Sequence, residues 1–418
     1  MLSRKIFEKL KEQRKEKKIS LLLGPRQVGK TTLLKELSKE FSLSHKCLFL
    51  DIDIISNYEK VNTFENLLNT LKLSGYQENQ KDFFYLFLDE FQKHPSLVNI
   101  MKNIYDNFDN VKIYASGSSS LAIKNQVQES LAGRKRVNEI YPLDFEEFIW
   151  FKQNQKLINK LKNVGKLKGE DLHKVVRELH DLLYEFLIFG GYPEVVLKES
   201  KEEKIAVLES IFDLYVKKDL IDYLKIDKIL NVKKIIEFLA INNGQKIKYE
   251  EISEVSHLSY TEIKNYIEIL KETYLITILK PFYTNKNKEL VKIPKIYFID
   301  PGVRNYFINN FNKLNLRGDS GFLFENFVVV ELMKKGFRNL KFWQDKNQNE
   351  IDIILERDSI LVPIEVKFKQ NLKSSDFNGL KVFLKAYPKT KITYLINLST
   401  QKDIKKTSLI LPYALEKI

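Results

Sequence analysis

The sequence predicts an α/β fold with a parallel sheet in the N-terminal part of the chain, and three observations lead to this prediction. Strand-like apolar runs alternate with helix-like segments from residue 19 to residue 142, a pattern typical of parallel strands joined by right-handed crossovers. The first run leads into a glycine-rich loop at residues 24–31, and a later run at residues 82–92 ends close to two acids. Because parallel strands end at the same edge of a sheet, we expect the loop and the acids to lie close together.

The glycine-rich loop has the pattern G-x-x-x-x-G-K-T, from Gly24 to Thr31. An apolar run precedes it and a helical pattern follows, which is the context of a phosphate-binding loop rather than of a chance glycine turn. Its backbone N–H groups would cradle phosphate oxygens at the N-terminus of the helix. Lys30 would reach the β- and γ-phosphates of ATP, and Thr31 would bind Mg²⁺. The predicted nucleotide-binding residues are Gly24, Pro25, Arg26, Gln27, Val28, Gly29, Lys30, Thr31 and Thr32.

The segment at residues 82–92 supplies the second half of the predicted ATP site, because its apolar strand terminates in Asp89 and Glu90. Asp89 would hold Mg²⁺ through water. Glu90 would orient and polarise the attacking water, as an ATP hydrolase requires. Acids at a strand end can also be plain caps, but the phosphate-binding loop earlier in the chain favours the catalytic interpretation.

Two further candidates lie after the acids. The segment at residues 111–120 predicts a strand followed by a Gly/Ser turn, and Ser116 or Ser118 would either sense the γ-phosphate or belong to a turn that caps the next helix. Arg134 follows a glycine at a predicted helix–strand junction. It would neutralise transition-state charge at a neighbouring subunit's γ-phosphate, which predicts a homo-oligomer. The alternative is a surface or phosphate-facing arginine of its own subunit.

Composition restricts the class of protein. The 418 residues suffice for about two to four domains, and 44% hydrophobic residues exclude a disordered chain. The single cysteine, Cys47, excludes disulfides within the chain, and five scattered histidines give no zinc-ligand spacing. No apolar stretch reaches the ~20 residues of a membrane span, and no signal peptide is recognisable, so we expect a cytoplasmic protein. The net charge of +14 suits contact with nucleic acid, although a lysine-rich surface would explain it equally well.

Several segments resemble those of a known family. GPRQVGKTT, LFLDEFQ, SGSSS, and LAGR followed by YPLDFEEF are similar to motifs of the archaeal and bacterial AAA-type ATPases often called archaeal ATPases. The resemblance continues into FGGYPEVV (residues 189–196) and YVKKDL (residues 215–220). It covers nearly the whole chain, apart from a charged helical insertion at residues 156–182. It implies an AAA-like domain, then a helical and winged-helix region, then a C-terminal domain resembling PD-(D/E)xK nucleases.

From Val232 the pattern itself has the outline of a winged helix-turn-helix, with three helices followed by two strands and a basic turn. Ser259 and Glu262 predict a capping box at the start of the third helix. That helix would enter the major groove of double-stranded DNA. Many winged helices serve packing or oligomerisation instead, and glutamates on the same helix oppose phosphate binding. The residues predicted to face the duplex are Tyr260, Lys264, Asn265 and Lys271, and those of the wing predicted to touch phosphates are Lys286 and Lys288.

The C-terminal part carries a second candidate site. Glu325 lies on a predicted helix, Asp352 on a strand, and Glu365 and Lys367 on a neighbouring strand. The two-residue period of a strand places Glu365 and Lys367 on one face. Asp352 and Glu365 would hold Mg²⁺, with Glu325 joining through a water molecule, and Lys367 would orient the attacking water and the phosphate. Folds of this kind also serve as binding platforms that do not cleave.

The sequence therefore predicts an AAA-like P-loop NTPase domain at residues 1–150 and a helical lid or linker at 151–224. A winged helix-turn-helix follows at 225–307 and an α/β nuclease-like domain at 318–418, with RGDSG (residues 317–321) as a linker. The predicted function is an Mg²⁺-dependent ATPase that couples hydrolysis to movement of DNA- or protein-binding C-terminal domains. Two alternatives stay open: an ATP-gated DNA nuclease, and a nucleotide-dependent switch that binds DNA or protein without cleaving. Cleavage requires the three C-terminal carboxylates to converge within reach of a metal.

Overall fold

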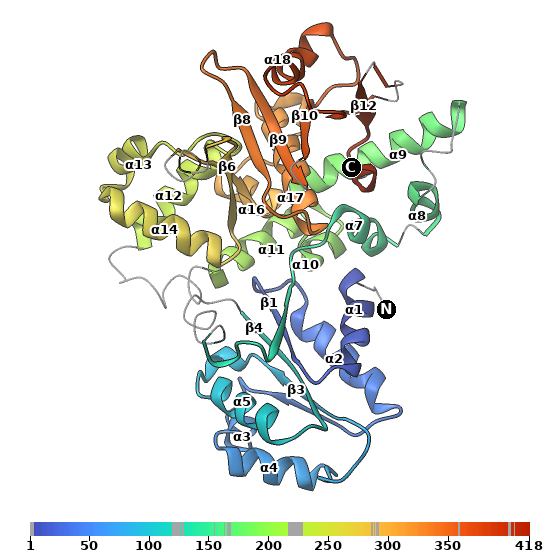
Figure 1. Cartoon of the computed structure of the whole chain (residues 1–418), viewed down its shortest axis with the longest axis vertical. Helices are drawn as coiled ribbons and strands as arrows, with labels where there is room; N and C mark the ends of the chain where they lie inside the picture. Colours follow the sequence, from blue (N-terminus) through green and yellow to red (C-terminus); the bar gives the residue numbers. More distant parts are fainter. Residues whose placement is uncertain are drawn as a thin grey trace. The chain divides into compact units, whose positions relative to one another are not determined.

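The computed structural model of the chain describes residues 4–118, 127, 129–153, 155–162, 164, 169–215, 229–285, 287, 289, 292–357, 360–399, 403–404 and 406–418. The chain divides into two compact units, one of Met1–Tyr141 with Glu272–Tyr274 and one of Pro142–Lys271 with Leu275–Ile418. Figure 1 shows their elements, coloured along the sequence. None of the helices in the described ranges is long and apolar enough to cross a membrane.

The first unit contains a five-stranded sheet in which every pair of neighbours is parallel, with the strand order β2-β3-β4-β1-β5. This confirms the predicted α/β class. The strands pack on the helices through apolar side chains that are almost fully buried. The strands are β1 (Ile19–Gly24), β2 (Cys47–Asp51), β3 (Phe84–Asp89), β4 (Val111–Ser118) and β5 (Lys135–Glu139). The helices are α1 (Lys5–Glu12), α2 (Lys30–Ser42), α3 (Ile55–Glu59), α4 (Phe64–Leu73) and α5 (Leu97–Asn107).

Strand β4 lies between β1 and β3, and this order decides which residues meet at the carboxyl edge of the sheet. Ser118 at the end of β4 is in register with Gly24 at the end of β1. On the other side, Leu88 near the end of β3 is in register with Ala115. The glycine-rich loop, residues 116–118 at the end of β4, and Asp89 and Glu90 at the end of β3 therefore share one edge, as the sequence predicts.

The opposite end of this sheet contains a buried amine. Lys112, at the start of β4, is fully buried, and its Nζ donates hydrogen bonds to the backbone oxygen of Lys18 and to Ser20 Oγ. A neutral amine has two N–H donors, which match these two acceptors. Burial lowers the pKa of Lys112 to about 7, although Glu16 raises it slightly. At low pH the fold therefore carries the cost of a buried ammonium.

We expect Lys112→Met to raise the thermal unfolding midpoint at pH 7, with a benefit that shrinks as the pH rises toward 9.5. The pKa is lowered in the folded state and is near 10.5 in the unfolded chain. Between these values the unfolded chain binds more protons, so wild-type stability increases with pH, by at most about 1.4 kcal/mol per pH unit. Midpoints measured across this range, with exposed Lys18→Met as the matched control, test the prediction. A difference between Lys112→Met and wild type that does not change with pH would contradict it.

The second unit combines helices with a seven-stranded mixed sheet of order β12-β11-β10-β9-β8-β6-β7. Its strands are β6 (Ile276–Pro281), β7 (Lys295–Phe298), β8 (Lys341–Gln344), β9 (Glu350–Arg357), β10 (Ile360–Val366), β11 (Thr393–Ile396) and β12 (Thr407–Ile410). The helices before the sheet are α7 (Phe145–Phe151), α8 (Gln155–Lys162), α9 (Gly169–Phe189), α10 (Pro193–Leu197), α11 (Lys201–Leu214), α12 (Ile229–Ile241), α13 (Tyr249–Ser256) and α14 (Tyr260–Glu272). Those within or after it are α16 (Pro301–Phe307), α17 (Ser320–Lys334) and α18 (Asn378–Ala386).

The elements expected for the winged helix are present, but they do not form a separate compact unit. Strands β6 and β7 pair antiparallel after α12, α13 and α14, and both hydrogen bonds of the Ser259–Glu262 capping box are made. Strand β6 also pairs in parallel with β8, which belongs to the expected nuclease-like region. The predicted boundary between residues 225–307 and 318–418 thus runs through one continuous sheet (Figure 1). Pairing between strands that are far apart in the chain cannot be recognised from the sequence of either strand alone.

Residues 317–321 were expected to form a linker, but side-chain hydrogen bonds hold them in place and Ser320 already begins α17. The Arg317 side chain is buried, and its guanidinium donates to Asp319 and to Asn305 Oδ1 at 2.8 Å each. Asp319 also accepts from buried Arg304. A glycine-containing polar stretch is therefore fixed by two arginines. The predicted wing residues Lys286 and Lys288 and most of the YVKKDL segment lie outside the described residues.

Candidate functional site

The glycine-rich loop follows β1 and ends at the N-terminus of α2. Gln27 and Gly29 have φ values of 60° and 92°, and left-handed residues of this kind turn neighbouring N–H groups toward one side of a loop. A Cβ on Gly24 would lie 2.0 Å from the backbone oxygen of Ile140, whereas one on Gly29 would meet no atom within 4 Å. The loop is thus packed on one flank and open at Gly29, and this shape fits the phosphate groups of ATP.

Lys30 begins α2 and is only 5% exposed. Its ammonium donates to the backbone oxygens of Gly24, at 3.1 Å, and Pro25, at 2.7 Å. These bonds hold the positive charge against the loop that would receive the phosphates. The same helix presents Thr31 next to it, so the cation and the hydroxyl predicted to bind ATP and Mg²⁺ come from adjacent positions.

The loop is also fixed from outside by Arg4, just before α1. Its Nη1 donates to the backbone oxygen of Val28 at 2.8 Å, and its Nη2 to that of Tyr141 at 2.9 Å. Arg4 thereby ties the loop to the segment that follows β5. Nothing in the sequence points to this residue, because it lies in a lysine- and arginine-rich segment without a motif.

Asp89, at the end of β3, is 1% exposed and accepts a hydrogen bond from the hydroxyl of Ser116. Burial raises the pKa of Asp89, although the hydroxyls of Ser116 and Thr31 lower it. Ser116 was predicted as a possible γ-phosphate sensor, and its hydroxyl here orients the Asp89 carboxylate. A buried carboxylate beside a threonine hydroxyl fits Mg²⁺, which favours oxygen ligands. Thr31 would hold the ion directly and Asp89 through water, and the ion would supply charge neutralisation at the phosphates.

Glu90 follows Asp89 directly and has a left-handed backbone, with φ of 55°. Its Oε2 accepts a hydrogen bond from Gln92 Nε2. Gln92 lies against Gly117, where an added Cβ would come within 2.6 Å of its Oε1. The base predicted from the sequence is therefore oriented by a glutamine that the sequence analysis missed. The only sequence feature that could have indicated Gln92 is Gly117, between Ser116 and Ser118, because a glycine there makes room for the glutamine side chain.

Comparison with known families agrees with this geometry. Residues 16–149 match the family model described as an AAA domain. This part of the chain is a P-loop ATPase-like domain. Residues 180–314 match a domain of unknown function (DUF8612), and residues 320–415 match another (DUF4143).

Similar proteins are known from archaea and bacteria. An uncharacterized protein of Methanocaldococcus jannaschii is 28% identical over 351 residues, which cover 81% of this chain and 72% of the relative. An uncharacterized protein of Haemophilus influenzae is 24% identical over 389 residues, which cover 90% of this chain and 88% of the relative. Among solved structures, the Walker-type ATPase PABY2304 of Pyrococcus abyssi has a TM-score of 0.49 and 15% identity, covering 74% of this chain and 96% of that one.

In the P-loop ATPase-like domain, Arg134 lies at the edge opposite the phosphate-binding loop. It directly precedes β5, and its backbone oxygen accepts from Ile19 N at the start of β1. Strand β1 spans about 16 Å from Ile19 to Gly24 at ~3.3 Å per residue. The guanidinium is half-exposed and pairs with both oxygens of Asp106 on α5, at 2.6 and 3.1 Å. This position excludes a role at the loop of its own chain, so the predicted action at a neighbouring subunit stays a prediction.

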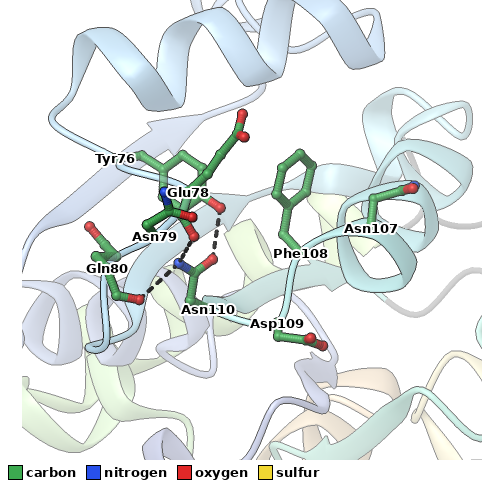
Figure 2. A pocket seen from close by; sticks show the side chains of 8 residues that line it. All are labelled: Tyr76, Glu78, Asn79, Gln80, Asn107, Phe108, Asp109 and Asn110. Carbon is green, nitrogen blue, oxygen red and sulfur yellow. Dashed lines mark hydrogen bonds between the residues drawn. The ribbon is translucent and has the colours of Figure 1, made fainter.

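A cavity of about 420 Å³ lies at this same opposite edge (Figure 2). It is lined by the segments before β3 and β4, residues 76–80 and 107–110. Figure 2 shows the Asn110 amide directed at the first segment, where its Nδ2 donates to backbone oxygens of Gln77, Glu78 and Gln80. Asn110 therefore holds the segment of residues 76–80 in place. The cavity lies at the amino ends of β3 and β4, whereas the phosphate-binding loop lies at the carboxyl edge of the sheet.

In the second unit, the four residues of the second candidate site share one buried region. Glu325 lies on α17, Asp352 on β9, Glu365 on β10, and Lys367 directly after β10. Lys367 Nζ is 2.5 Å from Glu365 Oε1 and 3.9 Å from Asp352 Oδ2. Burial, followed by the charge of Asp352, raises the pKa of Glu365 well above its ordinary value. The structure thus brings the predicted residues together, but in ion pairs.

The same region contains charged residues that the sequence analysis missed, Lys295 on β7 and Glu350 on β9. The described residues contain no group of three or more His, Cys, Asp or Glu side chains arranged to hold a metal ion. The predicted ligands Glu325, Asp352 and Glu365 are therefore neighbours without forming a metal cage. Lys295 escaped notice because it belongs to the expected wing, which sequence reasoning placed in another domain.

Proposed function

We propose that this protein hydrolyses ATP with Mg²⁺ at the carboxyl edge of the five-stranded sheet, as a member of the archaeal and bacterial AAA-type ATPases. One observation carries the proposal. Buried Asp89 directly precedes Glu90 and accepts a hydrogen bond from Ser116, and Thr31, at the end of the open phosphate-binding loop, is near enough to lower the pKa of Asp89. Loop, metal ligand and base are therefore assembled at one place, as phosphoryl transfer to water requires.

Within this proposal each residue has a distinct task. The loop and Lys30 bind and orient the phosphates. Thr31 and Asp89 position Mg²⁺, with Ser116 holding the carboxylate. Glu90, oriented by Gln92, accepts the proton of the attacking water. Arg134 would act at the site of a neighbouring copy, which makes the active form a homo-oligomer.

We further propose that hydrolysis is coupled to binding of double-stranded DNA or protein by the C-terminal parts of the chain. On α14, Tyr260 is 51% exposed, and Lys264 Nζ lies 4.5 Å from the centre of its ring. An exposed aromatic ring beside a lysine suits contact with a nucleic acid. Lys271 is less suited, because its ammonium pairs with Glu268 on the same helix.

The experiment is phosphate release by the full-length protein with ATP, in Mg²⁺ and in EDTA, with and without a DNA duplex. We expect Mg²⁺-dependent hydrolysis whose rate changes several-fold with DNA. Absence of hydrolysis under all conditions would overturn the ATPase proposal. If DNA does not change the rate of hydrolysis and ATP does not change the affinity for the duplex, DNA is excluded as the partner. A protein then remains as the proposed partner.

A second candidate function, ATP-gated DNA cleavage, rests on the convergence of Glu325, Asp352, Glu365 and Lys367. The ion pairs of these carboxylates favour the non-cleaving switch instead. Nicking of supercoiled plasmid in Mg²⁺ or Mn²⁺, with and without ATP, separates the two. Cleavage that is lost in Asp352→Ala would establish a nuclease, whereas intact plasmid under all conditions supports the switch.

A further inference from the structure

The buried cluster of the second unit is built around Lys295. This residue on β7 is 4% exposed. Its Nζ lies 3.1 Å from Glu325 Oε1 on α17 and 2.5 Å from Glu350 Oε1 on β9. Tyr297, on the same face of β7, donates to Glu325 Oε1 at 2.6 Å. One ammonium therefore bridges two carboxylates from separate elements, as a divalent cation would in a metal site.

The other two carboxylates are also engaged. Asp352 Oδ2 accepts from the backbone N–H of Val366 at 2.8 Å, and Glu365 Oε1 accepts from Lys367. Glu365 Oε2 is buried and makes no hydrogen bond. With these contacts, the cluster lacks the convergence of free oxygens that Mg²⁺ demands. The residues present therefore do not fit the metal that the nuclease resemblance implies.

The charge balance agrees with the geometry. Burial, followed by Asp352, raises the pKa of Glu325 to about 7, while Lys295 and Tyr297 lower it. Burial also lowers the pKa of Lys295, but Glu325, Asp352 and Glu350 raise it more, so the net direction is upward. The Lys295 ammonium therefore stays charged between the two carboxylates that it contacts.

We propose that the Lys295 ammonium takes the place of a divalent cation in this carboxylate cluster, so that the cluster is a metal-independent lock joining β7, β9 and α17. The proposal does not depend on ATP hydrolysis by the first unit. It implies that the carboxylates form a latent cation site. Removing the ammonium takes from Glu325 and Glu350 the positive charge that bridges them, and a divalent cation, which prefers oxygen ligands, would then bind in its place.

The test is Mn²⁺ binding by the full-length protein without nucleotide, followed through the electron paramagnetic resonance signal of free Mn²⁺. We expect wild type and Lys280→Met, an exposed lysine on β6, to give the same weak background. Lys295→Met should bind one additional Mn²⁺ at least ~10-fold more tightly. The double variant Lys295→Met with Glu325→Gln should lose this gain, because it removes one of the two carboxylates that the ammonium bridges.

Two results would overturn the proposal. Stoichiometric Mn²⁺ binding by wild type that disappears in Asp352→Asn would show a resident metal centre. A folded Lys295→Met protein without added Mn²⁺ binding would show that Lys295 is an ordinary ion-pair partner. If Lys295→Met does not fold, Lys295→Gln removes the charge and keeps a hydrogen-bond donor, and the wild-type measurement alone still decides whether a metal is resident.

Discussion

Glu90→Gln is expected to keep ATP bound while lowering its turnover by about 10²- to 10⁴-fold, the usual contribution of a general base. Glutamine preserves the size of the side chain but cannot accept the proton of the attacking water. Asp89, Thr31 and the loop are untouched by the change, so nucleotide affinity should stay near wild type. Single-turnover phosphate release and binding of a fluorescent ATP analogue measure the two properties separately.

The matched control for this variant is Glu65→Gln, an exposed glutamate on α4 of the same unit. It should hydrolyse ATP at the wild-type rate. Wild-type turnover in Glu90→Gln would place the base elsewhere and remove the role assigned to Gln92. Loss of ATP binding in Glu90→Gln would indicate a structural role for the carboxylate, since an altered base alone does not weaken the ground state.

Lys30→Ala is expected to weaken ATP binding by about 100-fold or more, because charge-assisted hydrogen bonds to phosphate contribute on the order of 1.5–3 kcal/mol each. The ammonium also bonds the loop backbone at Gly24 and Pro25, so its removal loosens the cradle as well. Titration with a fluorescent ATP analogue gives the affinity.

Lys35→Ala on the exposed side of the same helix is the control, and its ATP affinity should not change. Far-ultraviolet circular dichroism of Lys30→Ala excludes loss of fold as the cause. An unchanged dissociation constant in a folded Lys30→Ala protein would show that the glycine-rich loop is not the ATP site.

The proposed nucleotide site could be predicted from the sequence because each of its parts is formed by residues close together in the chain. A left-handed Gly29, a helix N-terminus and a lysine within one turn are fixed by neighbouring residues. Asp89 and Glu90 were found because a buried strand has a recognisable apolar run with a defined end. Parallel strands then bring these local features to one edge without any further information.

The contacts that refine this site were not local and left weaker signals. Gln92 orients Glu90 only because β4 places Gly117 beside it, and Arg4 reaches Val28 across the sheet edge. Arg134 was predicted to lie at a junction before a strand, and it directly precedes β5. The direction of β5 then decided that it begins at the far edge, beside Asp106, where it cannot serve its own loop.

By itself, then, the sequence determined the parallel α/β sheet of the first unit and the phosphate-binding loop, because backbone preferences and apolar periodicity act over a few residues. Only the tertiary structure decided that the expected wing and the C-terminal region share one sheet through β6 and β8. It alone placed Lys295 among the carboxylates of α17 and β9. Pairing between strands and the neutralisation of buried charges depend on residues far apart in the chain, and neither leaves a local pattern to read.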